Sequence, residues 1–185
     1  DEMLEMSSSG AGVLMARSVE FGRRYNVPII VKSTFTNNKG TVVKEKTMEE
    51  AIVSGVTHND KEVKFTLFGV PDQPGIAGTV FGSLSEIGTN VDMIVQNVSK
   101  ESITDISFTA PSEQQKDVED TLKNISKQLD AKGYDVDENI ARISIIGAGM
   151  KSESGVASKM FKTLGDNKIN ISMISTSPIR VSCVI

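Results

Sequence analysis

The clearest pattern of hydrophobic and polar positions begins at residue 63. Val63, Phe65 and Leu67 alternate with polar residues, which predicts a strand with one buried face. Apolar residues then recur at helical spacing over 76–87, and Gly88 follows where such a helix would end. The pattern therefore predicts a strand followed by an amphipathic helix.

The same stretch of chain continues with two more strands and a second helix. Strands are predicted at 90–98 and 103–110, separated by a polar break at 99–102. Apolar positions over 118–129 predict the second helix, and residues 134–139 predict a short fourth strand. The order β-α-β-β-α-β is that of the split βαβ fold of ferredoxin type.

The pattern then starts again, so the chain contains an internal repeat. Residues 142–149 predict a strand, and the apolar positions of the next helix match those of the first one. The second copy lacks counterparts of the last helix and strand. Three residue pairs lie at one constant offset: Gly75 and Gly155, Asn90 and Asn170, Met93 and Met173.

The residues before 46 follow a different pattern. Residues 12–26 predict a helix, and the nearly continuous apolar run 27–35 predicts a strand buried on both faces. A charged link at 41–50 and a short strand at 51–58 follow. The fold class is thus α+β, with two ferredoxin-like modules preceded by the end of an α/β domain. A helical pattern at the start and a strand at the end, neither of them bounded by a cap or turn, predict a fragment of a longer protein.

Composition narrows the classes of partner. The 185 residues are 38% hydrophobic and 24% charged, with a net charge of −4, scattered Lys and Arg, and no Trp. This balance argues against nucleic acid as a partner, and no apolar run is long enough for a membrane span. The single cysteine, Cys183, excludes a disulfide framework and a Cys-based metal site within one chain. We expect no metal and a reducing, cytoplasmic compartment.

The segment 70–81, VPDQPGIAGTVF, carries the strongest candidate chemistry. The amide groups of Gly75, Ile76 and Ala77 at a helix start have no intrahelical acceptor, and they favour a carboxylate or phosphate. Two prolines stiffen the approach, and Asp72 adds an acceptor for an ammonium group. This corner suits a zwitterion such as a free amino acid. A capped turn without a ligand is the alternative.

Asn90, Asp92 and Gln96 lie at alternate positions and predict one polar strand face, with a merely solvated sheet face as the alternative. Asp72 and Asp92 are predicted to be the two carboxylates nearest to the corner. The second copy has Ser172 in place of Asp92, so the two copies are not chemically equal.

Two further features have weak functional signals. The segment 147–155, GAGMKSESG, resembles a glycine-rich phosphate loop but lacks the spacing of the known nucleotide motifs, so nucleotide binding is a minor alternative. His58 is the only histidine and has no evident catalytic partner. We therefore expect no catalytic residue in this chain.

Taken together, these segments resemble the paired ACT domains of bacterial aspartokinases that respond to lysine and threonine. Residues 3–35 are similar to the end of the aspartokinase catalytic domain, so the resemblance covers nearly the whole chain. The stretches that carry the ACT resemblance are 70–81, 90–99, 104–111, 147–161 and 170–182.

The resemblance implies a division of the chain into four parts. Residues 1–45 would be the remnant of an α/β amino-acid-kinase domain, and 46–62 a linker with a strand that pairs with the second ACT domain. Residues 63–138 would be the first ACT domain. Residues 139–185 would be the second, incomplete at its C-terminus.

The resemblance also implies a function. Aspartokinase uses ATP and Mg to phosphorylate the side-chain carboxylate of L-aspartate, and its ACT pair binds lysine, threonine or both for feedback inhibition. The ATP-binding half has no counterpart here, so this chain alone should need no cofactor and be inactive. The expected partners are an amino-acid effector and either a second copy or a catalytic subunit. An ACT-type amino-acid sensor, a dimerisation subunit without ligand and a catalytic kinase fragment are the alternatives.

In the family, effectors sit between ACT modules. The second corner, KSESG, has no Asp-x-Pro-Gly sequence, which departs from the first. Carried over position by position, the effector-binding residues would be Asp72, Gln73, Pro74, Gly75, Ile76, Ala77, Asn90, Val91, Asp92, Gln96, Val156, Ala157, Asn170, Ile171, Ser177 and Pro178.

Overall fold

A computed structural model describes residues 1–45, 51–98 and 103–185. The predicted polar break at 99–102 and the second half of the predicted charged link lie outside the described residues. No helix in the described part of the chain is long and apolar enough to cross a bilayer.

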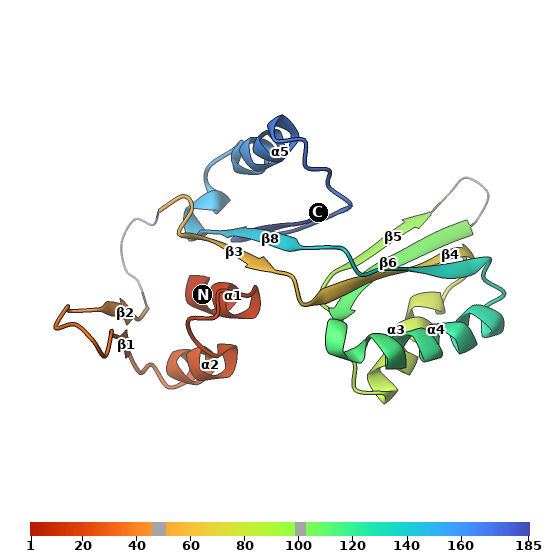
Figure 1. Ribbon diagram of the computed structural model, residues 1–185, viewed down its shortest axis with the longest axis horizontal. Coiled ribbons are helices and arrows are strands. Elements are labelled where there is room, and N and C mark those ends of the chain that lie inside the picture. The colour runs from red at the N-terminus through yellow and green to blue at the C-terminus, as the bar shows by residue number, and fades with distance from the viewer. Residues whose placement is uncertain (46–50, 99–102) are drawn as a thin grey trace. The chain divides into compact units, whose positions relative to one another are not determined.

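The chain forms two compact units. Unit 1 combines Asp1–Asn59 with Arg142–Ile185, and unit 2 is Asp60–Ala141. Unit 2 is therefore inserted into the sequence of unit 1, as the colours of Figure 1 show.

Unit 2 is an antiparallel four-stranded sheet in the order β5-β6-β4-β7, with both of its α-helices on one face (Figure 1). This is the ferredoxin-type order that the sequence predicts. Its elements are β4 (Glu62–Pro71), α3 (Ile76–Glu86), β5 (Ile94–Val98), β6 (Ile103–Pro111), the 3₁₀ turn η1 (Ser112–Gln114), α4 (Gln115–Gln128) and β7 (Gly133–Asp137).

The core of unit 2 lies between the sheet and the helices. Phe65 of β4 and Phe108 of β6 are fully buried and stack with their ring centroids 5.3 Å apart. Phe81 of α3 meets Phe108 edge-on at 5.7 Å. Val118 and Leu122 complete the core from α4. The alternation along β4 arises because every second side chain faces these helices.

Unit 1 contains a second antiparallel sheet in the order β3-β8-β10-β9. This order repeats that of unit 2, with β3 in the place of β7. The strand missing from the second copy is thus supplied from a segment that precedes unit 2. The elements of this module are β3 (Gly55–Asn59), β8 (Arg142–Ile146), the 3₁₀ turn η2 (Ala148–Lys151), α5 (Val156–Asp166), β9 (Met173–Ser177) and β10 (Arg180–Val184).

Helix α5 covers only part of its face of this sheet. Met160 and Leu164 of α5 pack on Val181 and Cys183 of β10. Val56 of β3 lies on the same face but is 66% exposed, because no helix of the described chain takes the place that α4 has in unit 2.

The remaining elements of unit 1 are α1 (Glu2–Ser8), α2 (Ala16–Arg24), β1 (Ile29–Val31) and β2 (Thr41–Val43). The prediction of a strand buried on both faces over 27–35 is wrong. Only three of these residues form a strand, and Ile30 is 58% exposed. The reason is that β1 pairs with β2 alone, and no described layer covers it. Helix α1 lies across the sheet from α5 (Figure 1).

Candidate functional site

The predicted corner of the first module is an exposed turn between β4 and α3. Gly75, at the helix N-cap, has a φ of 96°, a left-handed conformation that glycine adopts without steric cost. A Cβ added to Gly75 would meet nothing within 4 Å. The backbone at the start of α3 is therefore open to a ligand.

Hydrogen-bonding groups at this corner are available for binding. The first helical hydrogen bond runs from the Thr79 N–H to the Gly75 carbonyl oxygen at 2.9 Å, and no side chain caps the helix. The prediction of a free Ile76 amide is wrong, because its N–H donates to the Gln73 carbonyl oxygen at 3.4 Å and closes the turn. Within the described chain, the N–H groups of Ala77 and Gly78 have no acceptor. The exposed Asp72 carboxylate likewise has no partner among the described residues. Free donors and a free carboxylate within one turn can hold the two ends of a zwitterion.

The second corner repeats the backbone of the first but not its chemistry. Gly155 has a φ of 90°, and its carbonyl oxygen accepts the Lys159 N–H at 2.9 Å. No side chain caps this helix either. Ser152 stands where the first module has Asp72. The second corner therefore offers the same free amides without the same carboxylate.

The placement of Asp92 beside the corner is wrong for a single module. The Asp92 N–H donates to the Thr109 carbonyl oxygen at 3.2 Å, whereas Pro71, where the corner begins, pairs with Ile103. Thr109 and Ile103 lie six residues apart on β6, which is about 20 Å. Asn90 and Val91 share the far end with Asp92. The separation arises because α3 runs the length of the sheet before β5 begins.

The predicted polar face is also shorter than expected. Strand β5 begins at Ile94, so Asn90 and Asp92 precede it. Gln96 pairs with Ile106 and shares its helix-bearing face, but it is exposed because β5 is an edge strand. Of these polar residues, Gln96 lies nearest to the corner end of the sheet.

The residues carried over to the second module divide in the same way. The Gly147 N–H donates to the Ile179 carbonyl oxygen at 3.0 Å, which puts the turn between β9 and β10 next to the corner. At the other end, the Ser172 N–H donates to Val184 at 2.8 Å. The corner end holds Val156, Ala157, Ser177 and Pro178. The far end holds Asn170 and Ile171.

The glycines of the segment 147–155 have a packing role. A Cβ on Gly147 would lie 2.1 Å from the Ile52 carbonyl oxygen, and one on Gly149 would lie 2.9 Å from the Ala51 oxygen. The glycines at 147 and 149 are therefore explained by the close approach of another backbone segment. Their described neighbours give no support to the phosphate-loop alternative.

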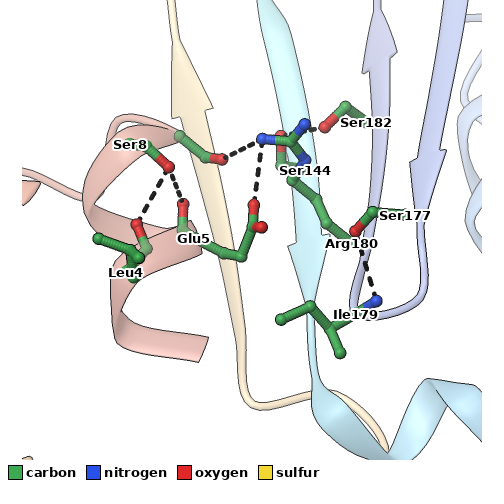
Figure 2. A network of polar contacts seen from close by, with 9 residues as sticks. Leu4, Glu5, Ser8, Ser144, Ser177, Ile179, Arg180 and Ser182 are labelled. Atoms are coloured by element: carbon green, nitrogen blue, oxygen red, sulfur yellow. Dashed lines mark hydrogen bonds and ion pairs between the residues drawn. The ribbon is translucent and has the colours of Figure 1, made fainter. Parts of the chain in front are cut away.

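Sequence reasoning missed a polar cluster between α1 and the face of the unit 1 sheet opposite α5. Arg180 of β10 pairs with Glu5 of α1 at 3.2 Å, and the two side chains are only 18% and 29% exposed. Figure 2 shows them facing each other, near the hydroxyl pair of Ser144 and Ser182. No periodic pattern connects residues so distant in the sequence, so no sequence signal could have found this contact.

Comparison with known proteins identifies the fold and its family. The sequence matches the ACT domain family over residues 64–130, and a second ACT domain family over residues 143–185. The regulatory subunit of aspartate kinase from Thermus thermophilus, in a ligand-free form, is 35% identical with a TM-score of 0.69. The match covers 73% of this chain and 89% of that one. The chain belongs to the aspartokinase family.

Within aspartokinases, the chain corresponds to the C-terminal regulatory region with two ACT domains. Aspartate kinase of Pseudomonas fluorescens strain SBW25 is 46% identical over an alignment of 188 positions. The alignment covers 100% of this chain and 46% of that protein. The chain thus spans about half the length of the aspartokinases that it matches. Aspartokinase III of E. coli, solved with lysine and aspartate, is 22% identical with a TM-score of 0.71. That match covers 100% of this chain and 41% of that one, and it shows the fold alone.

Proposed function

We propose that this chain is the effector-binding region of an aspartokinase and that it binds lysine, threonine or both. The effector would inhibit the ATP-dependent phosphorylation of L-aspartate by the whole enzyme. The observation that carries the proposal is the first corner, where amides of α3 and the Asp72 carboxylate lie within one turn and have no partner among the described residues. Support for lysine comes from E. coli aspartokinase III, which was solved in complex with it.

The separation of the two groups of residues suggests how a site is completed. One amino acid cannot span the roughly 20 Å between the corner and Asp92 in one module. We propose that an effector contacts the corner residues Asp72–Ala77 and Gln96 of one copy, and Asn90, Val91 and Asp92 of another. In the second module, the corresponding groups would be Val156, Ala157, Ser177 and Pro178 with Asn170 and Ile171. This arrangement requires a dimer or a larger assembly.

We further propose that residues 1–45 are the end of the catalytic domain and that the chain alone has no kinase activity. The chain spans about half the length of its relatives. Among the described residues, the glycines at 147 and 149 are explained by the close approach of Ile52 and Ala51. A coupled assay with aspartate and ATP tests this proposal, because turnover above background would refute it. A catalytic aspartokinase subunit is the expected partner.

Calorimetry with lysine and threonine tests the binding proposal. Asp72→Asn keeps the shape of the side chain but removes the acceptor charge for an ammonium group. A hydrogen bond to a charged group contributes about 1.5–3 kcal/mol, so the affinity should fall by about 10- to 150-fold. Asp120→Asn, which changes an exposed carboxylate on α4, should bind as the wild type does.

Three results would count against this assignment. Wild-type affinity of Asp72→Asn for both amino acids would show that the corner is only a turn. An equal loss in Asp120→Asn would attribute the effect to net charge. Absence of any binding to the wild type would favour a dimerisation subunit that works without ligand.

A further inference from the structure

Helix α1 is held by two carboxylates on the face of the unit 1 sheet opposite α5. Glu5 pairs with Arg180 of β10 (Figure 2). The Arg180 Nη1 also donates to the Ser9 hydroxyl at 3.5 Å. Glu2 lies one turn earlier on the same side of the helix. Its Oε1 accepts hydrogen bonds from the Ser54 hydroxyl and, at 2.8 Å, from the Ala148 N–H.

The contact of Glu2 with Ala148 reaches the second corner. Ala148 is the first residue of η2, which leads through Ser152 to Gly155 and the open start of α5. The loop that would hold an effector in the second module is therefore hydrogen-bonded directly to α1. The same loop is bonded to the turn before Arg180 through the Gly147 N–H and Ile179.

Close contacts also join α1, and the turn that follows it, to β3. A Cβ on Gly55 of β3 would lie 2.6 Å from Cε of Met6, so the helix rests close against that strand. A Cβ on Gly10 would lie 2.3 Å from the His58 carbonyl oxygen. Close packing of this kind favours discrete docked and undocked states over a gradual shift.

In the first module, the described residues include no arginine at the position that corresponds to Arg180. The hydroxyl pair Thr66 and Ser107 of unit 2 corresponds to the pair Ser144 and Ser182 of unit 1. Two residues before Ser107 stands Asp105, which occupies the place of Arg180 and accepts the Gly69 N–H at 2.8 Å. A carboxylate in this place would repel Glu5. The docking of α1 is therefore specific to the second module.

We propose that α1 and the second corner form one coupled unit, in which effector occupancy of residues 147–155 changes the docking of α1. Coupling of this kind is reciprocal, because α1 must alter effector affinity by the same factor that the effector alters docking. The ligand half of this inference rests on the proposed function. The coupling between α1 and the corner does not, since it can be measured without ligand.

Hydrogen exchange of the full 185-residue chain provides the test. Glu5→Ala removes the contact with Arg180 without touching the corner. It should speed exchange in residues 1–10 and also in 148–156, by about 5- to 150-fold, which is the usual range of coupling. Exchange at 72–78 in unit 2 should stay unchanged. Glu20→Ala, which changes an exposed residue of α2, is the matched control and should leave all three segments as they are.

Each other outcome overturns the inference. If α1 exchanges faster while 148–156 keep the wild-type rate, the helix and the corner are independent. If α1 itself is unaffected, Glu5 does not hold it. Should Glu5→Ala fail to fold, Glu5→Gln keeps the side-chain volume and is judged by the same criteria.

A ligand arm separates this inference from the proposed function. Saturating L-lysine or L-threonine should change the exchange of residues 1–10 in the wild type and much less in Glu5→Ala. Bound ligand that leaves residues 1–10 unchanged would overturn the inference. If calorimetry shows that neither amino acid binds, the proposed function fails, and the coupling is decided by the ligand-free comparison alone.

Discussion

Replacing Gly147 by alanine should destabilise unit 1 by about 2 kcal/mol. Gly147 is buried directly after β8 and has a φ of 177°, which any residue can adopt, so the backbone conformation itself has no cost. The new Cβ would lie 2.1 Å from the Ile52 carbonyl oxygen and 2.8 Å from its carbonyl carbon. Since backbone cannot rotate away as a side chain can, the segment around Ile52 must move.

The magnitude follows from what that segment holds. The Ser54 N–H donates to the Ile146 oxygen at 2.7 Å, and the Gly149 N–H donates to the Ala51 oxygen at 3.4 Å. Each hydrogen bond contributes about 0.5–1.5 kcal/mol, so the loss of both costs about 1–3 kcal/mol. With an m-value of about 2 kcal/mol/M, the urea midpoint should fall by about 1 M.

Urea titration followed by circular dichroism measures this change, and Gly165→Ala is the matched control. Gly165 lies within α5, where an added Cβ meets nothing within 4 Å. Alanine is favoured there by about 0.5–1 kcal/mol, so the midpoint should rise. The same substitution thus has opposite signs at two sites of one unit. A wild-type midpoint for Gly147→Ala would refute the packing argument and reopen the question of a ligand at these glycines.

Three further predictions concern the site, the core and the cysteine. Gln96→Ala should weaken effector binding in calorimetry while changing the free energy of unfolding by no more than about 0.5 kcal/mol, and unchanged affinity would remove Gln96 from the site. Phe108→Ala should lower the free energy of unfolding by about 3–5 kcal/mol in denaturant titrations, because it leaves a cavity beside Phe65 and Phe81. If Phe108→Ala lowered it no more than Phe108→Leu does, this reasoning would be wrong. Burial raises the pKa of the Cys183 thiol above its ordinary value of 9.0. Its contribution to stability is therefore complete below pH 9 and lost as the pH rises through the folded pKa, so stability should fall more steeply with alkaline pH in the wild type than in Cys183→Ala.

Local periodicity was sufficient to predict most of the elements. The alternation of Val63, Phe65 and Leu67 arises from one buried face, and that face is the one on which α3 and α4 pack. The corner at Gly75 was predictable because a left-handed residue at a helix start favours glycine. The repeat between Gly75 and Gly155 added information, since the two corners do have the same backbone.

The positions of elements in space were less predictable. Alternation placed Asp92 on a face but gave no indication of which end of the sheet it occupies. The apolar run containing Ile30 is the same whether or not another layer covers it, so burial on both faces could not be deduced. Glycine is needed at 147 and 149 because the backbone of residues 51–53 lies too close for a Cβ. That close approach depends on how the whole sheet is assembled. The contact between Glu5 and Arg180 has the same long-range origin.

The insertion of unit 2 between β3 and β8 also orders the steps of folding during synthesis. Asn59 and Arg142 are direct neighbours across the β3–β8 ladder, yet all of unit 2 lies between them in the sequence. At ribosomal rates of about 5–20 residues per second, the about 80 intervening residues take roughly 4–16 seconds to emerge. Throughout that interval β3 has no partner strand from its own sheet, whereas every element of unit 2 becomes available. The nascent chain can therefore complete the first ACT domain while the second, begun earlier, is still open.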